Sequence, residues 1–216
     1  VCNIGDASMG CGPVWEGISF ATMDQYTKLW QGEYMGGLPL IFNFMNNLYG
    51  MGGQTMGETM GFGILARIGA GVNPDMMHAE RIDGYNPLAV IDAFRRKREI
   101  LDKKRGPVLL DTLTYRISGH SPSDASSYRS KEEIDAWQKV DSIITYGEQL
   151  AEAGVAKPEL LDEIRSEAGE LLAHILKLAI SDEISPRLDL ISDPDAIGSM
   201  MFSNKSVDRM EDRKPD

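Results

Sequence analysis

The feature that most constrains this chain is an alternation of short apolar runs with longer segments of helical spacing. Strands are predicted at residues 1–4, 38–44, 79–83 and 108–115, and helices at 14–28, 61–70 and 86–104. Such alternation favours a three-layer α/β fold, in which a mainly parallel sheet lies between two layers of helices. Polar turns follow the strands, and the carboxyl ends of parallel strands meet at one edge of the sheet. We therefore expect a ligand site at that edge.

The last third of the chain is predicted to be helical. Helices are expected over 131–153 and 158–181, the first ending at Gly154. The second helix carries a continuous apolar stripe that predicts a packing surface, formed by Leu160, Leu161, Ile164, Ala168, Leu171, Leu172, Ile175 and Leu176. The predicted organisation is an α/β domain at 1–137, a helical extension packed on it at 138–202, and a charged tail or linker at 203–216.

The net charge excludes several functions. The 216 residues carry a formal charge of −11, which argues against nucleic acid binding and against a basic membrane anchor. The most apolar stretch, 171–180, is too short to span a bilayer. No signal peptide precedes the first strand, so a cytoplasmic location is expected. The chain begins on Val1 as though a strand were already under way, which predicts that it is a fragment of a longer protein.

Several residues of reactive type are predicted to be structural. Cys2 and Cys11 fit no zinc spacing and are expected to be small buried apolar residues. His78 and His174 lie in no motif. The basic run 95–98 is predicted to be a solvated helix face.

Asp6 and Asn47 are the strongest candidates for chemistry. Each follows a predicted strand, so both are expected at the ligand-binding edge. A carboxylate, an amide oxygen and a nearby main-chain carbonyl form the hard oxygen set that magnesium prefers, with phosphates completing the shell. The turn after Asp6 opens a helix, whose first N–H groups suit a diphosphate. The alternative is that each residue caps its own turn, as Asp and Asn commonly do.

Three blocks of sequence, taken in order, resemble one family. Gly5-Asp6-Ala7 and Asn46-Asn47 are similar to the Gly-Asp-Gly and Asn-Asn halves of the thiamine diphosphate motif, and Leu48–Gly52 resembles the run that follows it. The segment Thr114–Asp124, closing on Tyr128-Arg129, resembles an active-site loop. The family is that of the α-subunits of thiamine diphosphate-dependent 2-oxo acid dehydrogenases, acting on pyruvate, branched-chain 2-oxo acids or acetoin.

The resemblance implies a thiamine diphosphate-binding fold and a set of functional residues. Asp6, Asn47 and the main-chain carbonyl of Tyr49 would bind magnesium, and His120 would be catalytic. The implied cofactor-binding residues are Gly5, Asp6, Ala7, Ser8, Asn47, Tyr49, Met51 and His120. The implied active-site loop contains Arg116, Ser121, Asp124, Tyr128 and Arg129. The residue that matches Ser121 is a phosphorylation site in eukaryotic relatives.

The implied activity is oxidative decarboxylation of a 2-oxo acid, with acyl transfer to a lipoyl group on an acyltransferase. The glutamate that activates the cofactor belongs to a β-subunit or fused β-domain, in a dimeric or α2β2-type assembly. The fragment alone is therefore expected to be inactive. Alternatives are a thiamine diphosphate enzyme for acetoin or a sugar phosphate, and a non-catalytic assembly domain. A nicotinamide-binding domain ranks third, because the first turn lacks the Gly-x-Gly-x-x-Gly pattern.

The chain departs from the family pattern at three places. Ala7 replaces the third motif glycine, which is acceptable only if this position avoids positive φ. Asp6 and Asn47 are 41 positions apart, a longer interval than is usual in the family. We expect 31–37 to form a surface insertion that accounts for the difference. Met45 replaces a residue that is usually polar.

Overall fold

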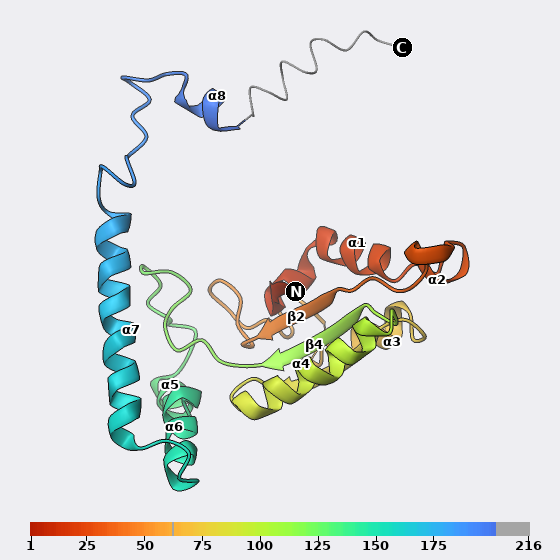
Figure 1. Cartoon of the computed structure of the whole chain (residues 1–216), viewed down its shortest axis with the longest axis horizontal. Helices are drawn as coiled ribbons and strands as arrows, with labels where there is room; N and C mark the ends of the chain where they lie inside the picture. Colours follow the sequence, from red (N-terminus) through yellow and green to blue (C-terminus); the bar gives the residue numbers. More distant parts are fainter. Residues whose placement is uncertain (62, 202–216) are drawn as a thin grey trace. The chain divides into compact units, whose positions relative to one another are not determined.

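The chain folds into two compact units, residues 1–155 and 156–216. The structure is a computed structural model that describes residues 1–61 and 63–201 (Figure 1). Within these ranges, no helix is long and apolar enough to cross a membrane. The predicted domain boundaries at 137 and 202 stay predictions, and the predicted tail at 203–216 lies outside the described residues.

A four-stranded parallel sheet is the centre of the first unit. Its order is β1-β2-β4-β3, with all neighbouring pairs parallel, and the strands are β1 Cys2–Gly5, β2 Ile41–Asn46, β3 His78–Asp83 and β4 Val108–Leu113. Gly5 pairs with Met45, and Asn46 and Asp83 both pair with Leu113, so all four strands end at one edge. The predicted α/β fold with a parallel sheet is confirmed.

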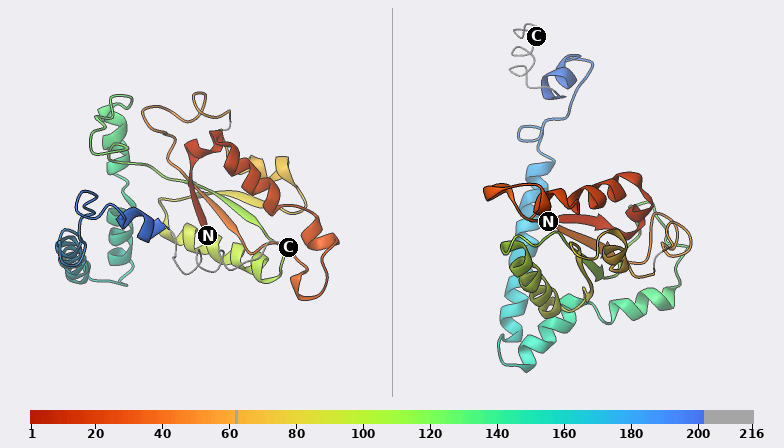
Figure 2. Two further views of the ribbon diagram at one scale, coloured as in Figure 1. Left: turned by 90° about the horizontal axis from the view of Figure 1, so that it is seen from above. Right: turned by 90° about the vertical axis from the view of Figure 1, so that its right-hand side faces the viewer.

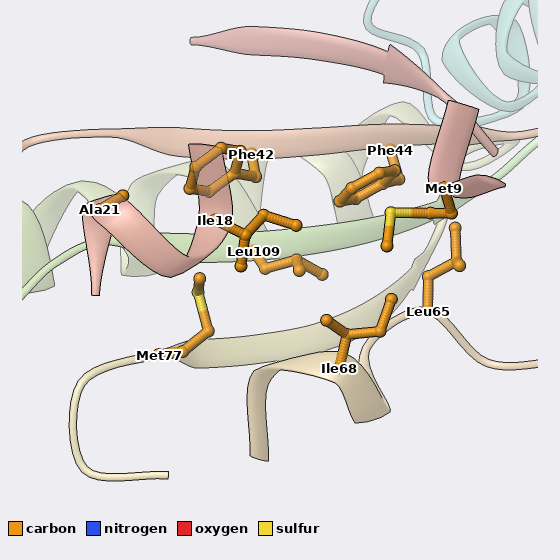
Figure 3. Close-up of a cluster of buried hydrophobic side chains, with 9 residues drawn as sticks. All are labelled: Met9, Ile18, Ala21, Phe42, Phe44, Leu65, Ile68, Met77 and Leu109. Carbon is orange, nitrogen blue, oxygen red and sulfur yellow. The ribbon is translucent and has the colours of Figure 1, made fainter. Parts of the chain in front are cut away.

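Helices cover both faces of this sheet (Figures 1 and 2). On one face, Ile18 of α1 (Gly12–Ala21) and Ile68 of α3 (Arg67–Val72) pack with Phe42 and Phe44, as Figure 3 shows. On the other face, α4 (Pro87–Asp102) packs against strand residues that include Ile41. Because successive side chains of a strand point to opposite faces, β2 contributes to both apolar clusters.

The centre of the sheet also contains a buried carboxylate. Asp111 of β4 is fully buried and accepts hydrogen bonds from Asn46 Nδ2, Leu65 N and Arg81 Nε, each at 2.8 Å. Arg81 also donates to the carbonyl of Gly63 at 2.6 Å. Asp111 thus connects β2, β3 and β4 with the loop before α3. The sequence predicted only an apolar strand at this position.

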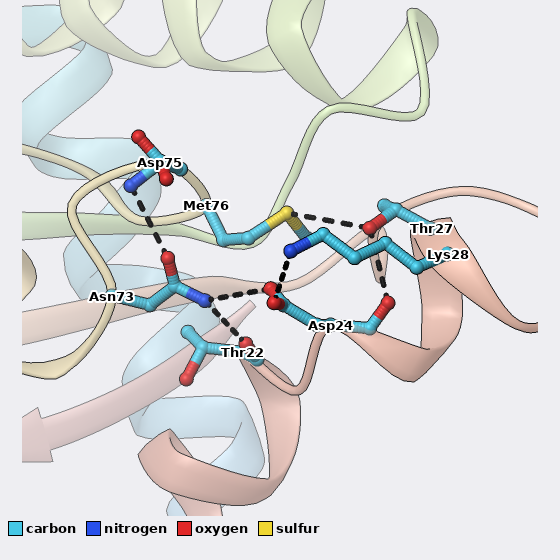
Figure 4. A network of polar contacts seen from close by, with 7 residues as sticks. All are labelled: Thr22, Asp24, Thr27, Lys28, Asn73, Asp75 and Met76. Atoms are coloured by element: carbon cyan, nitrogen blue, oxygen red, sulfur yellow. Dashed lines mark hydrogen bonds and ion pairs between the residues drawn. The ribbon is translucent and has the colours of Figure 1, made fainter.

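The predicted helix at 14–28 is two helices, which corrects the prediction. A break at 22–24 separates α1 from α2 (Gln25–Lys28). The hydroxyl of Thr22 donates to the carbonyls of Ile18 and Ser19, and its own carbonyl accepts from Asn73 Nδ2 (Figure 4). Side-chain hydrogen bonds of this kind compete with helix continuation. The same network links the break to the segment after α3.

The predicted helix at 131–153 is also two helices. These are α5 (Lys131–Gln138) and α6 (Ser142–Glu152), and Asp141 caps the second by accepting from Ile143 N at 2.8 Å. Gly154 has φ +68, which confirms it as the stop. The segment at 31–37 contains a short 3-10 helix, η2 (Gly32–Tyr34), and is mostly exposed, as expected for a surface insertion.

The second unit contains the long predicted helix and one further helix. The long helix is α7 (Pro158–Ala179), which is close to the predicted span. Its apolar stripe is exposed in the described residues, with Leu172 at 66%. The prediction that this stripe is a packing surface therefore stays a prediction. The sequence did not predict the short helix α8 (Ala196–Met201).

Two predictions about burial are wrong. Cys2 and Cys11 are exposed, because Cys2 lies on the edge strand β1 and Cys11 in the turn before α1. Lys97 is only 5% exposed, although the basic run was predicted to be solvated. Its ammonium group pairs with Glu80 at 2.9 Å, and Arg96 holds the same carboxylate. These contacts lower the pKa of Glu80 to about 2, with Arg96 as the main cause.

The role of Asp111 and its hydrogen bonds, together called the Asp111 hub, can be tested by measuring the stability of a variant. Asp111→Asn keeps the volume of the side chain but leaves Arg81 without its carboxylate partner, and breaking a buried ion pair typically costs about 3–5 kcal/mol. Arg81 is partly exposed, so we expect a loss of about 2–3 kcal/mol in the free energy of unfolding. Urea denaturation would measure it. Asp92→Asn removes a solvated ion pair with Arg96 and is the control. Equal losses in both variants would contradict a central role for Asp111.

Candidate functional site

The first half of the site is Asp6, directly after β1. Gly5 ends the strand, and Asp6 opens a 3-10 helix, η1 (Asp6–Gly10). Asp6 is 1% exposed, and Thr55 Oγ1 donates to its Oδ2 at 2.7 Å. Burial raises the pKa of this carboxyl, while hydrogen bonds from Thr55 and from the main chain of Ala7 and Leu48 act in the opposite direction. Among the described residues, no Lys, Arg or His forms an ion pair with Asp6.

The second half is the turn after β2, where the structure separates the roles of two asparagines. Asn46 is fully buried and bonded to Asp111, so its role is structural. Asn47 is half-buried at the sheet edge, and its Oδ1 accepts from Tyr49 N at 3.0 Å. Asn47 therefore does cap its own turn, as the simpler alternative predicted. An amide oxygen has two lone pairs, so this bond leaves one free for a metal ion.

The two halves are in contact at the carboxyl edge of the sheet. Thr55 connects them, because its Oγ1 donates to Asp6 Oδ2 at 2.7 Å and its N–H donates to Leu48 O at 3.0 Å. A Cβ added to Gly50 would lie 3.2 Å from the Cβ of Ala7, so the turns pack closely. Ala7 lies in η1 and is not among the non-glycine residues with positive φ, which meets the condition set for this replacement.

The unusual backbone of this turn is at Leu48, which has φ +68. Non-glycine residues seldom adopt this left-handed conformation, because it brings the Cβ close to the main chain. Here the surroundings hold it, since Leu48 N donates to Asn46 Oδ1 at 3.3 Å and Leu48 O accepts from Thr55 N at 3.0 Å. Backbone strain held in this way is often found at functional sites.

These residues fit a divalent cation. A buried carboxylate without a cationic partner favours binding of a positive ion, which would offset the cost of its desolvation. Asn47 Oδ1 and the Tyr49 carbonyl would supply further oxygen donors of the type that magnesium uses. No group of three or more His, Cys, Asp or Glu that could hold a metal exists in the described residues. A metal at this edge therefore depends on amide and carbonyl oxygens.

Arg116 joins the predicted active-site loop to the Asn47 turn. Its guanidinium donates to Gly50 O at 3.1 Å and Tyr128 OH at 2.7 Å, and lies 3.3 Å from His120 Nδ1. Asp124 closes the loop by accepting from His120 N at 2.7 Å and from Tyr128 OH. The His120 main chain, followed by Tyr128, lowers the pKa of Asp124 to about 2. The structure thus brings together these four predicted loop residues.

Arg129 holds the base of the loop. It is 7% exposed and donates to the carbonyls of Arg116 and Ser118. Its guanidinium also lies over the rings of Tyr49, Tyr115 and Tyr128, at 5.6, 5.3 and 5.6 Å. Cation–π contacts of this kind stabilise a desolvated guanidinium. The ring of Tyr49 therefore connects the predicted metal turn with the loop.

The remaining predicted residues are more exposed. Ser8 lies in η1 and is half-buried, whereas Met51 is 83% exposed. His120 and Ser121 are both exposed, and Ser121 Oγ lies 3.2 Å from Ser123 Oγ. The described contacts therefore connect His120 to the turn only indirectly, through Arg116. The roles predicted for these residues stay predictions.

Sequence reasoning missed two residues that contact the site. Thr55 lies in a Gly- and Met-rich stretch without a clear pattern, so nothing marked it as a partner of Asp6. Glu133 accepts hydrogen bonds from Tyr49 OH at 2.8 and 2.9 Å. The sequence Ser130-x-x-Glu133 is the usual pattern of a helix start, so it predicts a local capping role for Glu133 and not a contact with Tyr49.

The fold and these two turns define an α/β domain with a buried carboxylate and an amide at the carboxyl edge of a parallel sheet. Comparison with known proteins identifies the family. The model of the dehydrogenase E1 component family matches residues 1–186. This chain belongs to that family.

The relatives are α-subunits of 2-oxo acid dehydrogenases. The chain is 30% identical over 191 residues to a Caenorhabditis elegans protein named probable pyruvate dehydrogenase E1 component subunit alpha, mitochondrial, covering 88% of this chain and 44% of that protein. It is 32% identical over 174 residues to the 2-oxoisovalerate dehydrogenase subunit alpha of Bacillus subtilis, covering 78% of this chain and 48% of that protein. It is also 30% identical over 188 residues to the human pyruvate dehydrogenase E1 component subunit alpha, somatic form, mitochondrial, covering 86% of this chain and 44% of that protein. The chain spans less than half the length of these relatives.

The burial of Asp6 generates a test of the site. Its raised pKa means that the ligand-free protein loses stability as pH rises through that pKa, because the folded state disfavours the ionised form. At pH 7, Asp6→Asn removes the buried charge and should therefore raise the melting temperature of the ligand-free protein. The same variant should lose the further stabilisation given by magnesium with thiamine diphosphate. Differential scanning calorimetry measures both effects, and an unchanged response to the ligands would exclude Asp6 as a metal ligand.

Proposed function

We propose that this chain is the thiamine diphosphate- and magnesium-binding part of a 2-oxo acid dehydrogenase E1 component. The reaction is oxidative decarboxylation of a 2-oxo acid, with transfer of the acyl group to a lipoyl group. Family membership supports the class of enzyme. The observation that carries the site is the buried Asp6 carboxylate, which Thr55 links to the turn that contains Asn47 and Tyr49.

The proposed binding residues lie on the two contacting turns. Asp6, Asn47 Oδ1 and the Tyr49 carbonyl would hold magnesium, which would neutralise the diphosphate in a chain that is acidic overall. Gly5, Ala7 and Ser8, where the chain turns from β1 into η1, would contact the diphosphate. Thiamine diphosphate, when bound, supplies the electron-accepting ring that decarboxylation needs.

His120 is proposed to act as a hydrogen-bond donor in its neutral form. A guanidinium only donates hydrogen bonds, so His120 Nδ1 acts as the acceptor towards Arg116. The ring proton is then on Nε2, which leaves this atom free to donate to a ligand oxygen. Arg116 and Asp124 orient the imidazole and the main chain that carries it.

The rest of the catalytic machinery is proposed to lie outside this chain. A β-subunit or fused β-domain would supply the glutamate that activates the cofactor, in a dimeric or α2β2-type assembly, and a lipoyl-bearing acyltransferase would receive the acyl group. Several relatives are named as α-subunits, which supports a separate β-subunit. A cytoplasmic location also remains a proposal, and the fragment alone should be inactive.

Calorimetric titration of the full-length protein, assembled with its β part, tests this function. Thiamine diphosphate with magnesium should release heat with one site per α chain, and Asp6→Ala should abolish it. Asp75→Ala removes an exposed carboxylate on another loop and should leave binding intact. Absence of heat from the unsubstituted assembly would favour a non-catalytic assembly domain. Turnover of pyruvate, branched-chain 2-oxo acids, acetoin and sugar phosphates would then identify the substrate class.

A further inference from the structure

The carboxylate of Glu133 connects α5 to the predicted metal turn. Glu133 is half-buried in the first turn of α5 and is 84 positions away from Tyr49 in sequence. Its Oε1 and Oε2 accept from Tyr49 OH at 2.8 and 2.9 Å, and Oε1 also accepts from Tyr115 OH at 3.0 Å. Hydrogen bonds to a carboxylate are stronger than those between neutral groups, so the two tyrosine hydroxyls hold the Glu133 side chain firmly.

The start of α5 does not require this contact. Ser130 Oγ already caps the helix by accepting from Glu133 N at 3.1 Å. In the usual capping box, the glutamate side chain turns back to the N–H of the capping residue. Here both described partners of the carboxylate are tyrosine hydroxyls from other segments. The local helix signature therefore leaves the direction of this side chain unexplained.

Tyr49 is held at both ends. Its main-chain N–H donates to Asn47 Oδ1, and its hydroxyl donates to Glu133. Between these ends, its ring packs edge-on to Tyr115, with centroids 6.2 Å apart, and lies beneath the Arg129 guanidinium. The N–H and the side-chain tip thus hold Tyr49 in place, and the next peptide, which carries the Tyr49 carbonyl, is held by Gly50 N, which donates to Gly53 O at 2.9 Å.

We propose that Glu133 is a positioning residue for the metal site, holding Tyr49, and with it the main-chain carbonyl of this residue, in place through the Tyr49 hydroxyl. This inference rests on the proposed function, in which that carbonyl is a magnesium ligand. The hydroxyl of Tyr115 also donates to the Glu133 carboxylate, but no atom of Tyr115 is a proposed metal ligand. Loss of its hydroxyl should therefore not disturb the metal, although it removes a similar hydrogen bond.

This difference between the two tyrosines gives the test. In the full-length assembly, the dissociation constant of magnesium is measured by calorimetry at saturating thiamine diphosphate. Glu133→Ala and Tyr49→Phe should each weaken magnesium binding by about tenfold, as loss of a residue that orients a ligand typically does. The double variant should be no weaker than either single variant, because both changes break one contact. Tyr49→Phe keeps the ring and removes only the hydroxyl, so it tests the same contact even if Glu133→Ala fails to fold.

The matched controls separate positioning from general stability. Tyr115→Phe and the exposed neighbour Glu132→Ala should change magnesium affinity less than twofold. Glu133→Gln, which keeps an acceptor oxygen for Tyr49, should restore most of the affinity lost in Glu133→Ala. Equal weakening by Tyr49→Phe and Tyr115→Phe, or unchanged affinity in Tyr49→Phe, would overturn the positioning role alone. If the unsubstituted assembly binds neither ligand, the proposed function fails and this inference fails with it.

Discussion

The hydrogen bonds to Asp111 hold together the strands that end at the carboxyl edge of the sheet. One carboxylate on a central strand accepts from Asn46 on the neighbouring strand, Arg81 on the other neighbour, and Leu65 in the loop before α3. Fully buried polar groups are tolerated when their hydrogen bonds are complete, and they then specify one arrangement of the elements around them. Asn46 is fixed by this hub, so Asn47 must follow at the edge of the sheet.

Two buried aspartates of the same domain have opposite electrostatic surroundings. Asp111 has a guanidinium partner and several N–H donors. Asp6 has a hydroxyl and main-chain donors, no ion-pair partner among the described residues, and a pKa raised mainly by burial. The first arrangement stabilises the fold by itself. The second leaves the charge of Asp6 without a counterion among the described residues, which is the physical basis for assigning a structural role to Asp111 and proposing a binding role for Asp6.

The sequence allowed the parallel sheet and both edge turns to be predicted, because strand patterns and motif residues are local. It did not reveal Asp111, whose hydrogen bonds come from distant segments, or Thr55 beside Asp6. The helix breaks at Thr22 and Asp141 escaped prediction because the apolar pattern continues across them, whereas the breaks depend on side-chain hydrogen bonds. Lys97 illustrates the same limit, since its burial depends on Glu80 in another element.

The left-handed residue in the turn after β2 has a further consequence. Both polar main-chain groups of Leu48 are bound, the N–H by Asn46 Oδ1 and the carbonyl by Thr55 N. The conformation of this turn is therefore fixed by contacts within the protein, before any ligand binds. The conformational entropy of this segment is lost during folding, so binding need not oppose that loss again.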